Sequence, residues 1–169
     1  IIPFAVLSRV PGKTYPIENM KKIIRHCLQH YDAQFVFFYS PDQKEQVKEI
    51  EKDLKYPGNI FSNLETKDMR ELMALFANST CYIGNEGGPR HLAQALGLPC
   101  FALFNPTADK KEWLPYPSAS NVGIEPKDTL AFHKMTEEEY KTLTKEEAFS
   151  LMTVPFILEK LDLFLSAIL

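Results

Sequence analysis

The sequence contains no long apolar run and no strong excess of charge of either sign. A membrane-spanning helix needs about 18 or more consecutive apolar residues, and no such run occurs in the chain. The 19 Lys and Arg residues nearly balance the 22 Asp and Glu residues, which gives a net charge of −3. Because nucleic acids and anionic membranes attract strongly basic proteins, we expect no nucleic-acid partner. A local basic site remains compatible with this composition.

Cysteine is scarce, and no metal-binding pattern is present. The three cysteines are Cys27, Cys81 and Cys100, and they lie in or beside apolar runs. No Cys-x-x-Cys or Cys/His ligand spacing occurs, and the aspartates are scattered rather than paired as Asp-x-Asp. The sequence therefore predicts buried, reduced thiols in a cytoplasmic protein and no metal site.

Two common nucleotide-binding patterns are also absent. Neither Gly-x-Gly-x-x-Gly after the first apolar segment nor a Walker A loop is found. This disfavours a nicotinamide-dependent oxidoreductase and a P-loop enzyme. The chain also lacks an initial Met and a basic leader, and its opening IIPFAVLS is typical of a core strand. We therefore expect a single domain over residues 1–169 that is a fragment of a longer protein.

Short apolar segments alternate with segments of helical periodicity along the chain. Apolar residues at helical spacing predict helices at 17–31, 42–54, 66–78 and 88–96. A Pro-Gly turn follows the helix expected at 42–54. Short connections between such units produce right-handed βαβ crossovers. The sequence predicts an α/β domain with a doubly wound, mainly parallel sheet of five or six strands, at residues 3–8, 34–40, 59–62, 80–85, 99–105 and 121–125.

The last third of the chain has a weaker pattern. Residues 107–120 form a polar loop with several prolines, which we expect at the carboxyl edge of the sheet, where ligands bind. Thr136–Glu139 and Thr144–Glu147 match capping boxes and predict short helices. An apolar stripe from Val154 to Ile168 predicts a final helix.

The stretch IGNEGGPRHLAQALG, residues 83–97, leads from a strand into a helix through two glycines and a proline. Gly87 and Gly88 allow a ligand to approach the backbone, and Pro89 fits the first helical turn. Free N–H groups at a helix start attract anions, and His91 in the same turn can donate to a phosphate oxygen. Glu86 can accept hydrogen bonds from sugar hydroxyls. The alternative is a tight corner with a surface histidine.

A second polar segment, SRVPGKTYP at residues 8–16, follows the first strand. It is expected at the same edge of the sheet as Glu86 and His91, because parallel strands end on one side. Arg9 and Lys13 supply two cations there in a chain that is acidic overall. The alternative is a loop whose lysine is simply solvated.

Together these segments resemble glycosyltransferase family 9, the ADP-heptose:lipopolysaccharide heptosyltransferases. The family pattern runs N-D-S/T-G-P-x-H-L-A-x-A-L-G-x-P, then a strand and F-G-P-T. A K-x-W-P segment follows the first strand of the same half, and Lys13–Pro16 is its counterpart here; Trp113–Pro115 is similar to the segment after F-G-P-T. The matching residues in the main signature are Asn85, Gly88, Pro89, His91, Leu92, Ala93, Ala95, Leu96, Gly97, Pro99, Phe104, Pro106 and Thr107.

The resemblance implies the Rossmann-like C-terminal, donor-binding half of a two-domain GT-B enzyme. In such an inverting enzyme, Lys13 and the helix start at Gly88, Pro89 and His91 would hold the diphosphate of an ADP-sugar. Glu86 and Gly87 would lie near the donor sugar. A loop including Arg9, Thr107 and Trp113 would border the nucleotide rather than hold its phosphates.

The resemblance further implies a heptose-like sugar and a lipid-linked saccharide acceptor, such as a lipopolysaccharide core. The general base would be an aspartate of the missing N-terminal domain, so this chain contains no catalytic residue and is inactive alone. The ADP-sugar is a substrate, and no cofactor is expected. The full-length protein would be cytoplasmic and peripheral to the inner face of the inner membrane.

Three residues depart from the family pattern. Glu86 replaces an aspartate, Gly87 replaces a serine or threonine, and Asn105 replaces the glycine of F-G-P-T. The first two changes fall in the expected sugar pocket, so the sequence does not determine which sugar the donor carries. They also favour an alternative, a degenerate, non-catalytic domain that binds a sugar or a partner.

Overall fold

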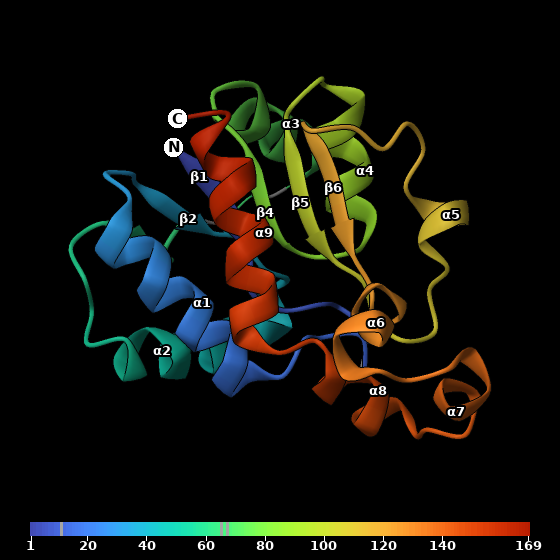
Figure 1. Cartoon of the computed structure of the whole chain (residues 1–169). Helices are drawn as coiled ribbons and strands as arrows, with labels where there is room; N and C mark the ends of the chain where they lie inside the picture. Colours follow the sequence, from blue (N-terminus) through green and yellow to red (C-terminus); the bar gives the residue numbers. More distant parts are fainter. Residues whose placement is uncertain (11, 65, 67) are drawn as a thin grey trace.

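A parallel sheet runs through the centre of the molecule, with helices on both faces (Figure 1). The computed structural model describes residues 1–10, 12–64, 66 and 68–169. Within these residues the sheet has six strands in the order β3-β2-β1-β4-β5-β6. This confirms the predicted doubly wound α/β fold. The strands are β1 (Ile2–Ala5), β2 (Phe35–Phe37), β3 (Ile60–Phe61), β4 (Tyr82–Asn85), β5 (Cys100–Leu103) and β6 (Asn121–Ile124).

The order of the strands reverses between β1 and β4. From β1 the chain moves outward to β2 and β3, and it then returns to place β4 on the other side of β1. Connections on the two sides of this pair leave in opposite directions, which opens a crevice beyond the carboxyl ends of the two strands. The fold therefore predicts a ligand site at the ends of β1 and β4.

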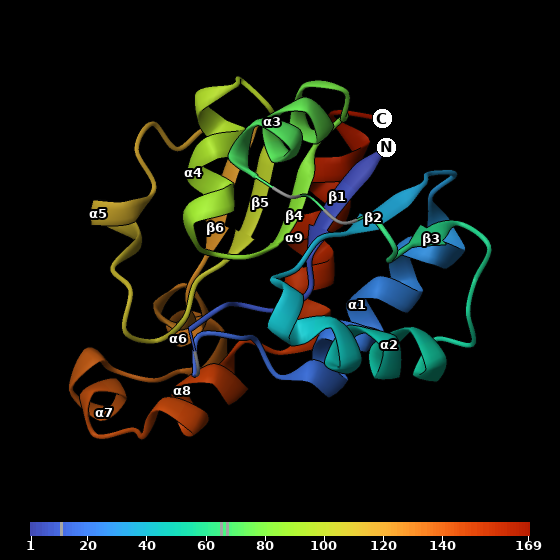
Figure 2. The same ribbon diagram turned by 180° about the vertical axis from the view of Figure 1, so that it is seen from behind.

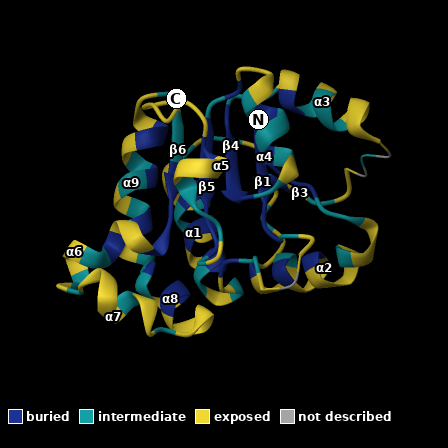
Figure 3. Ribbon diagram, turned by 90° about the vertical axis from the view of Figure 1, so that its right-hand side faces the viewer, coloured by how far each residue is buried: buried dark blue, intermediate teal, exposed yellow. Residues whose placement is uncertain are grey.

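Two helical layers cover the sheet. Helices α1 (Ile17–His30) and α9 (Val154–Ser166) lie on one face, in front of the strands in Figure 1. Helices α3 (Met69–Ala77) and α4 (Gly88–Ala95) lie on the other, as the reverse view in Figure 2 shows. Helix α2 (Lys44–Asp53) adds Val47 and Ile50 to the core on the α1 side. The four inner strands β2, β1, β4 and β5 are buried between these layers, whereas the edge strands β3 and β6 are partly exposed (Figure 3).

The final helix packs on this domain. Ile157, Leu161 and Phe164 of α9 are buried in the main core, and the Phe164 ring lies 5.6 Å from that of Phe101 on β5. The Asp162 carboxylate accepts a hydrogen bond of 2.6 Å from the Tyr31 hydroxyl at the end of α1. The predicted helix at the end of the chain is thus confirmed, and the contacts locate it against α1.

The predicted thiols and capping boxes are also confirmed. All three cysteines are buried and unpaired. Thr136 caps α7 (Glu137–Lys141) and Thr144 caps α8 (Lys145–Leu151), each by accepting from the N–H group three residues later. Within the described residues, no helix is long and apolar enough to span a membrane.

Several predicted boundaries need correction. The helix expected at 66–78 begins only at Met69, because the Asp68 side chain caps it by accepting from the N–H groups of Arg70 and Glu71; Lys67 lies outside the described residues. The helix expected at 42–54 opens with a 3₁₀ turn, Pro41–Gln43, and ends before the Pro-Gly turn, where Lys55 and Tyr56 adopt positive φ. The strands are shorter than their apolar runs.

The segment expected as a loop at 107–120 contains one helical turn, α5 (Lys110–Trp113). The Asp109 side chain caps this turn by accepting from the N–H of Lys111 at 2.8 Å. A 3₁₀ turn, Pro126–Thr129, and α6 (Leu130–His133) follow β6 and were not predicted. Helices α6, α7 and α8 gather below the carboxyl edge of the sheet (Figure 1).

Candidate functional site

A cleft of about 740 Å³ opens at the carboxyl ends of β1, β2 and β4. It lies at the strand reversal that the fold identifies as a ligand site. Most of the sequence-predicted site residues line it together, although they come from separate parts of the chain. These residues are Arg9, Lys13, Glu86, Gly87, Gly88, Pro89, His91 and Trp113.

Thr107 is the predicted site residue that does not line this cleft. It is exposed, and both its N–H and its hydroxyl donate to Oδ1 of Asn105, at 3.0 and 2.6 Å. Asn105 itself is buried, and its amide nitrogen has no hydrogen-bond partner. The Thr107 hydroxyl therefore turns the chain at the end of β5 rather than reaching the ligand space.

Strands β1 and β4 approach each other unusually closely at the base of the cleft. Gly84 is paired with Ala5 and has a φ of +136°. A β-carbon at Gly84 would lie 2.4 Å from the carbonyl oxygen of Ala5, which no side chain can accept. Only glycine fits here, because the obstructing atoms belong to the backbone.

The Asn85 side chain joins β4 to the two ends of the loop that follows β1. Its Oδ1 accepts from the N–H of Tyr15 at 2.7 Å, and its Nδ2 donates to the carbonyls of Ala5 and Val6 at 3.0 and 2.9 Å. The amide is buried and uses both its donor and its acceptor. Asn85 therefore fixes the loop that carries Lys13 beside the strand that carries Glu86.

Thr14 and Tyr15 fix the rest of this loop. The Thr14 hydroxyl accepts from the N–H of Ser8 at 2.9 Å and closes the loop; Pro11 within it lies outside the described residues. The buried Tyr15 hydroxyl donates to the carbonyl of Met152, beyond the end of α8, and burial raises its pKa to about 12. With its neighbours anchored in this way, Lys13 is half-buried at the wall of the cleft.

Helix α4 begins at Gly88 and turns its N-terminus to the cleft. Gly87 is extended, with φ 163° and ψ −176°, and leads directly into the helix. The N–H of Arg90 donates back to the carbonyl of Gly87 at 3.0 Å. Among the described residues, the N–H groups of Gly87 and Gly88 find no acceptor, and Pro89 has no N–H. Two backbone donors are thus free for an anion at the positive end of the helix dipole.

The charges around the cleft are unevenly balanced. In the part of the chain that the structure describes, no carboxylate lies within ion-pair distance of Arg9 or Lys13. The Glu86 carboxylate is buried, and its Oε1 lies 3.8 Å from Nε2 of His91. Two free cations and two free N–H groups favour an anionic ligand, whereas Glu86 supplies an acceptor for hydroxyl groups.

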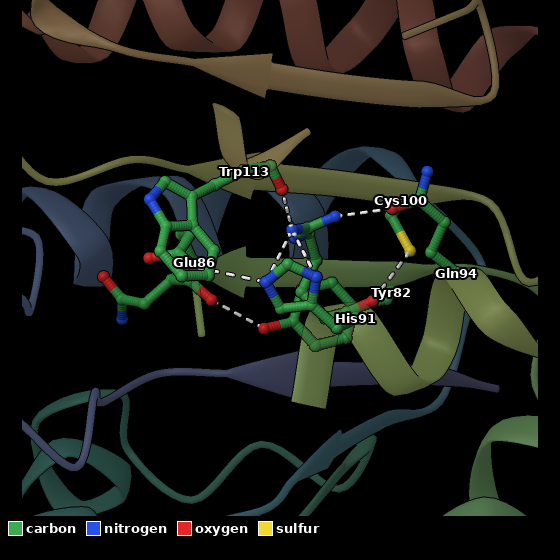
Figure 4. Close-up of polar contacts among 8 residues, drawn as sticks. Tyr82, Glu86, His91, Gln94, Cys100 and Trp113 are labelled. Atoms are coloured by element: carbon green, nitrogen blue, oxygen red, sulfur yellow. Dashed lines mark hydrogen bonds and ion pairs between the residues drawn. The ribbon is translucent and has the colours of Figure 1, made fainter. Parts of the chain in front are cut away.

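Arg90, a fully buried arginine on the first turn of α4, was not among the predicted site residues. Its Nη1 donates to Oε1 of Gln94 at 2.6 Å, and its Nη2 donates to the carbonyl of Trp113. The same Nη2 lies 3.0 Å from both ring nitrogens of His91 (Figure 4). A charged residue on a short helix is normally exposed, so its sequence position carries no signal of burial.

His91 and Trp113 form an aromatic corner of the cleft. Their rings lie 5.8 Å apart at an angle of 69°, an edge-to-face arrangement. Burial lowers the pKa of His91, and the Arg90 cation lowers it further, while Glu86 acts in the opposite direction. The pKa of His91 therefore lies below that of a free imidazole, and negative charge brought close to the ring would raise it.

The described residues contain no group of three or more His, Cys, Asp or Glu side chains arranged to hold a metal ion. The ligand chemistry that the cleft offers is thus carried by backbone N–H groups, cations, the Glu86 carboxylate and an aromatic corner, while the Asp68 carboxylate, which also lines the cleft, caps α3. Such a set suits a phosphate-containing ligand with a hydroxylated part.

Solved structures with this fold include heptosyltransferases. The chain aligns to E. coli ADP-heptose lps heptosyltransferase II with a TM-score of 0.72 and 21% identity, over 98% of this chain and 46% of that one. A glycosyl transferase family 9 protein from Veillonella parvula aligns with a TM-score of 0.72 and 22% identity, over 98% of this chain and 46% of that one. E. coli heptosyltransferase WaaC with ADP-2-deoxy-2-fluoro heptose aligns with a TM-score of 0.66 and 14% identity, over 95% of this chain and 42% of that one. These likenesses show the fold, and the chain spans less than half the length of each of these proteins.

A search of curated proteins finds no match. The model of glycosyltransferase family 9, the heptosyltransferases, matches residues 1–142 and so includes all the strands and the cleft. The match covers most of the 169 residues. The chain therefore belongs to glycosyltransferase family 9.

Proposed function

We propose that this chain is the donor-binding half of a heptosyltransferase-like enzyme and that its cleft holds an ADP-sugar. The main support for this proposal is that Lys13 and the free N–H groups of Gly87 and Gly88 line the same cleft at the strand reversal. One solved relative is described as containing ADP-2-deoxy-2-fluoro heptose. The acceptor half would be supplied by a part of the protein outside this chain.

In this proposal the diphosphate lies at the N-terminus of α4. Lys13 and the free N–H groups contact its oxygens, and His91 donates to it once protonated. Arg9 and Trp113 border the nucleotide, and the Glu86 carboxylate accepts from hydroxyl groups of the sugar. These roles follow from the chemistry of each group and from its position on the cleft wall.

The proposed reaction is an inverting transfer. A hydroxyl of a lipid-linked saccharide, such as a lipopolysaccharide core, attacks the anomeric carbon, the bond to the diphosphate breaks, and ADP leaves. A base outside this chain takes the hydroxyl proton. Lys13 and the α4 N-terminus stabilise the charge that develops on the leaving phosphate. Because that base lies outside this chain, the chain alone binds the donor without transferring sugar. The full-length enzyme would work at the cytoplasmic face of the membrane, where a lipid-linked acceptor lies.

Calorimetry with ADP and with an ADP-sugar tests the proposal. We expect one molecule of ADP to bind per chain, and we expect added inorganic phosphate to compete only weakly. A chain that folds normally but binds neither ADP nor an ADP-sugar would contradict the proposal. That result would favour the alternative of a domain that keeps the fold and has lost the donor.

The affinity for an ADP-sugar should rise as the pH falls. Burial lowers the pKa of His91 in the free chain, and a bound diphosphate would raise it, so binding takes up a proton. The affinity begins to rise as the pH falls below the raised pKa of His91 in the complex. The rise is complete only below the lowered pKa of His91 in the free chain. Its steepest slope approaches about tenfold per pH unit. Titrations at several pH values measure it, with His91→Gln expected to show no such slope. An equal slope in that variant would refute the assignment.

Residues 86 and 87 should determine which sugar is held and should contribute little to folding. A β-carbon at Gly87 meets only Cδ of Pro89, at 3.8 Å, and the extended backbone suits any residue. Gly87→Ser and Glu86→Asp, alone and combined, should therefore leave the unfolding midpoint nearly unchanged. We expect the ratio of affinities for two ADP-sugars to change about tenfold, while ADP binds as before. Equal ratios in all variants would place the sugar elsewhere.

A further inference from the structure

Arg90 is a buried cation without a carboxylate partner in the described part of the chain. Its Nε has no hydrogen-bond partner, and its guanidinium carbon lies 5.8 Å from the centre of the Phe104 ring. Burying a charge is costly unless it is paired. Two of the three residues that its guanidinium contacts through Nη1 and Nη2, His91 and Trp113, form the aromatic corner of the cleft, and the third is Gln94.

Arg90 and Gln94 together hold the segment that carries Trp113. Arg90 donates to the carbonyl of Trp113, and Nε2 of Gln94 donates to the carbonyl of Pro115 at 2.6 Å. Arg90 also donates to Gln94, so the two side chains form one connected support (Figure 4). Between the two carbonyls, the buried Leu114 side chain packs against Phe104. Two residues one turn apart on α4 thus fix both sides of Leu114.

The same guanidinium also lies against the His91 ring. Nη2 is 3.0 Å from both Nδ1 and Nε2. An approach in the ring plane, equally close to both nitrogens, would overlap the carbon between them, so Nη2 lies over the face of the ring. In this position Arg90 limits the rotation of the imidazole, which also packs edge-to-face with Trp113.

We infer that Arg90 is a positioning residue for donor binding, which holds Trp113 and His91 as a preformed wall of the cleft. It lies beneath that wall and does not line the cleft itself. Its planar fork suits this role, because one group reaches a helix side chain, a loop carbonyl and a ring face together. The ligand in this inference rests on the proposed function, whereas the preformed wall exists without ligand.

Trp113 is the only tryptophan of the chain, so its fluorescence reports on this wall alone. In Arg90→Met, the constant for quenching of Trp113 by acrylamide should rise about twofold without ligand, because the segment opens more often. The dissociation constant for ADP should rise about tenfold. Arg90→Lys should lie between the wild type and Arg90→Met, because an ammonium group cannot reach all three partners.

The titration of His91 gives a readout that a purely structural role would not move. Arg90 of the same helix lies against this ring, and the charged residues that line the cleft with it are Glu86 at the end of β4, Asp68 at the start of α3, and Arg9 and Lys13 on the β1 loop. Arg90 lowers the pKa of His91, so Arg90→Met should raise the midpoint followed by NMR on the free chain. An unchanged midpoint would contradict the contact.

Lys21→Met provides the matched control. Lys21 is, like Arg90, a buried basic residue. Its Nζ pairs with the carboxylate of Asp53 on α2 at 2.6 Å, and it does not line the cleft. Its loss should lower stability and leave Trp113 quenching, ADP affinity and the His91 midpoint as in the wild type. If Arg90→Met fails to fold, Gln94→Ala replaces it, because Gln94 is only partly buried and supports the same segment.

The outcomes separate this inference from the proposed function. Wild-type quenching of Trp113 in folded Arg90→Met, or in Gln94→Ala if it is used, overturns the positioning role. Weaker ADP binding with a raised quenching constant supports it. If the wild-type chain binds no ADP, the proposed function fails, while the quenching and the His91 midpoint still decide the role of Arg90.

Discussion

Gly84→Ala should strongly destabilise the fold. The new β-carbon would lie 2.4 to 2.8 Å from three backbone atoms of Ala5, and the φ of +136° disfavours a side chain even in open space. Strain and overlap together should cost about 4 kcal/mol, a large part of the stability of an ordinary domain. Urea unfolding followed by circular dichroism measures the loss.

Gly58→Ala is the matched control for this substitution. A β-carbon at Gly58 meets no atom within 4 Å, and its backbone is not left-handed. The change should alter the free energy of unfolding by less than about 1 kcal/mol. Equal stability of the two variants would show that β1 and β4 do not approach as closely at Gly84 as the structure indicates.

Lys13→Glu should abolish measurable ADP binding without affecting the fold. The change removes a cation that pairs with no carboxylate among the described residues, and it places a negative charge at the proposed diphosphate site. Lost attraction and added repulsion should together weaken binding at least about a hundredfold, compared with about tenfold for Lys13→Ala. Calorimetry in about 0.15 M salt, where the Debye length is about 8 Å, gives both values.

Lys22→Glu carries the same charge change at an exposed position of α1 that is not part of the cleft. It should reduce ADP affinity only slightly, because solvent and salt screen an exposed charge that does not line the cleft. If Lys22→Glu and Lys13→Glu weaken binding equally, the effect reflects net charge, and Lys13 does not contact the diphosphate.

The sequence predicted the sheet well because its strands are short apolar runs between helices of clear periodicity. It also brought Lys13 and His91 to one place, since the ends of parallel strands lie on one edge of the sheet. Helix boundaries were less accurate where a side chain decides them. Asp68 sets the start of α3, and no periodicity distinguishes it from Thr66 two residues earlier.

The supports of the cleft were not predictable from periodicity. The burial of Arg90 depends on partners 4 and 23 residues away, and Asn85 bridges to atoms about 70 to 80 residues distant. Gly84 did offer a signal, because glycine inside a strand often marks a close backbone approach. Thr107 was placed near the nucleotide by resemblance alone, and local hydrogen bonds to Asn105 hold it outside the cleft.

The most direct test of the account is a crystal structure of the chain with ADP. We predict that the diphosphate lies at the N-terminus of α4, with oxygens within hydrogen-bond distance of the N–H groups of Gly87 and Gly88 and of Nζ of Lys13. ADP bound at another place, with the α4 N-terminus in contact with solvent only, would contradict the central claim.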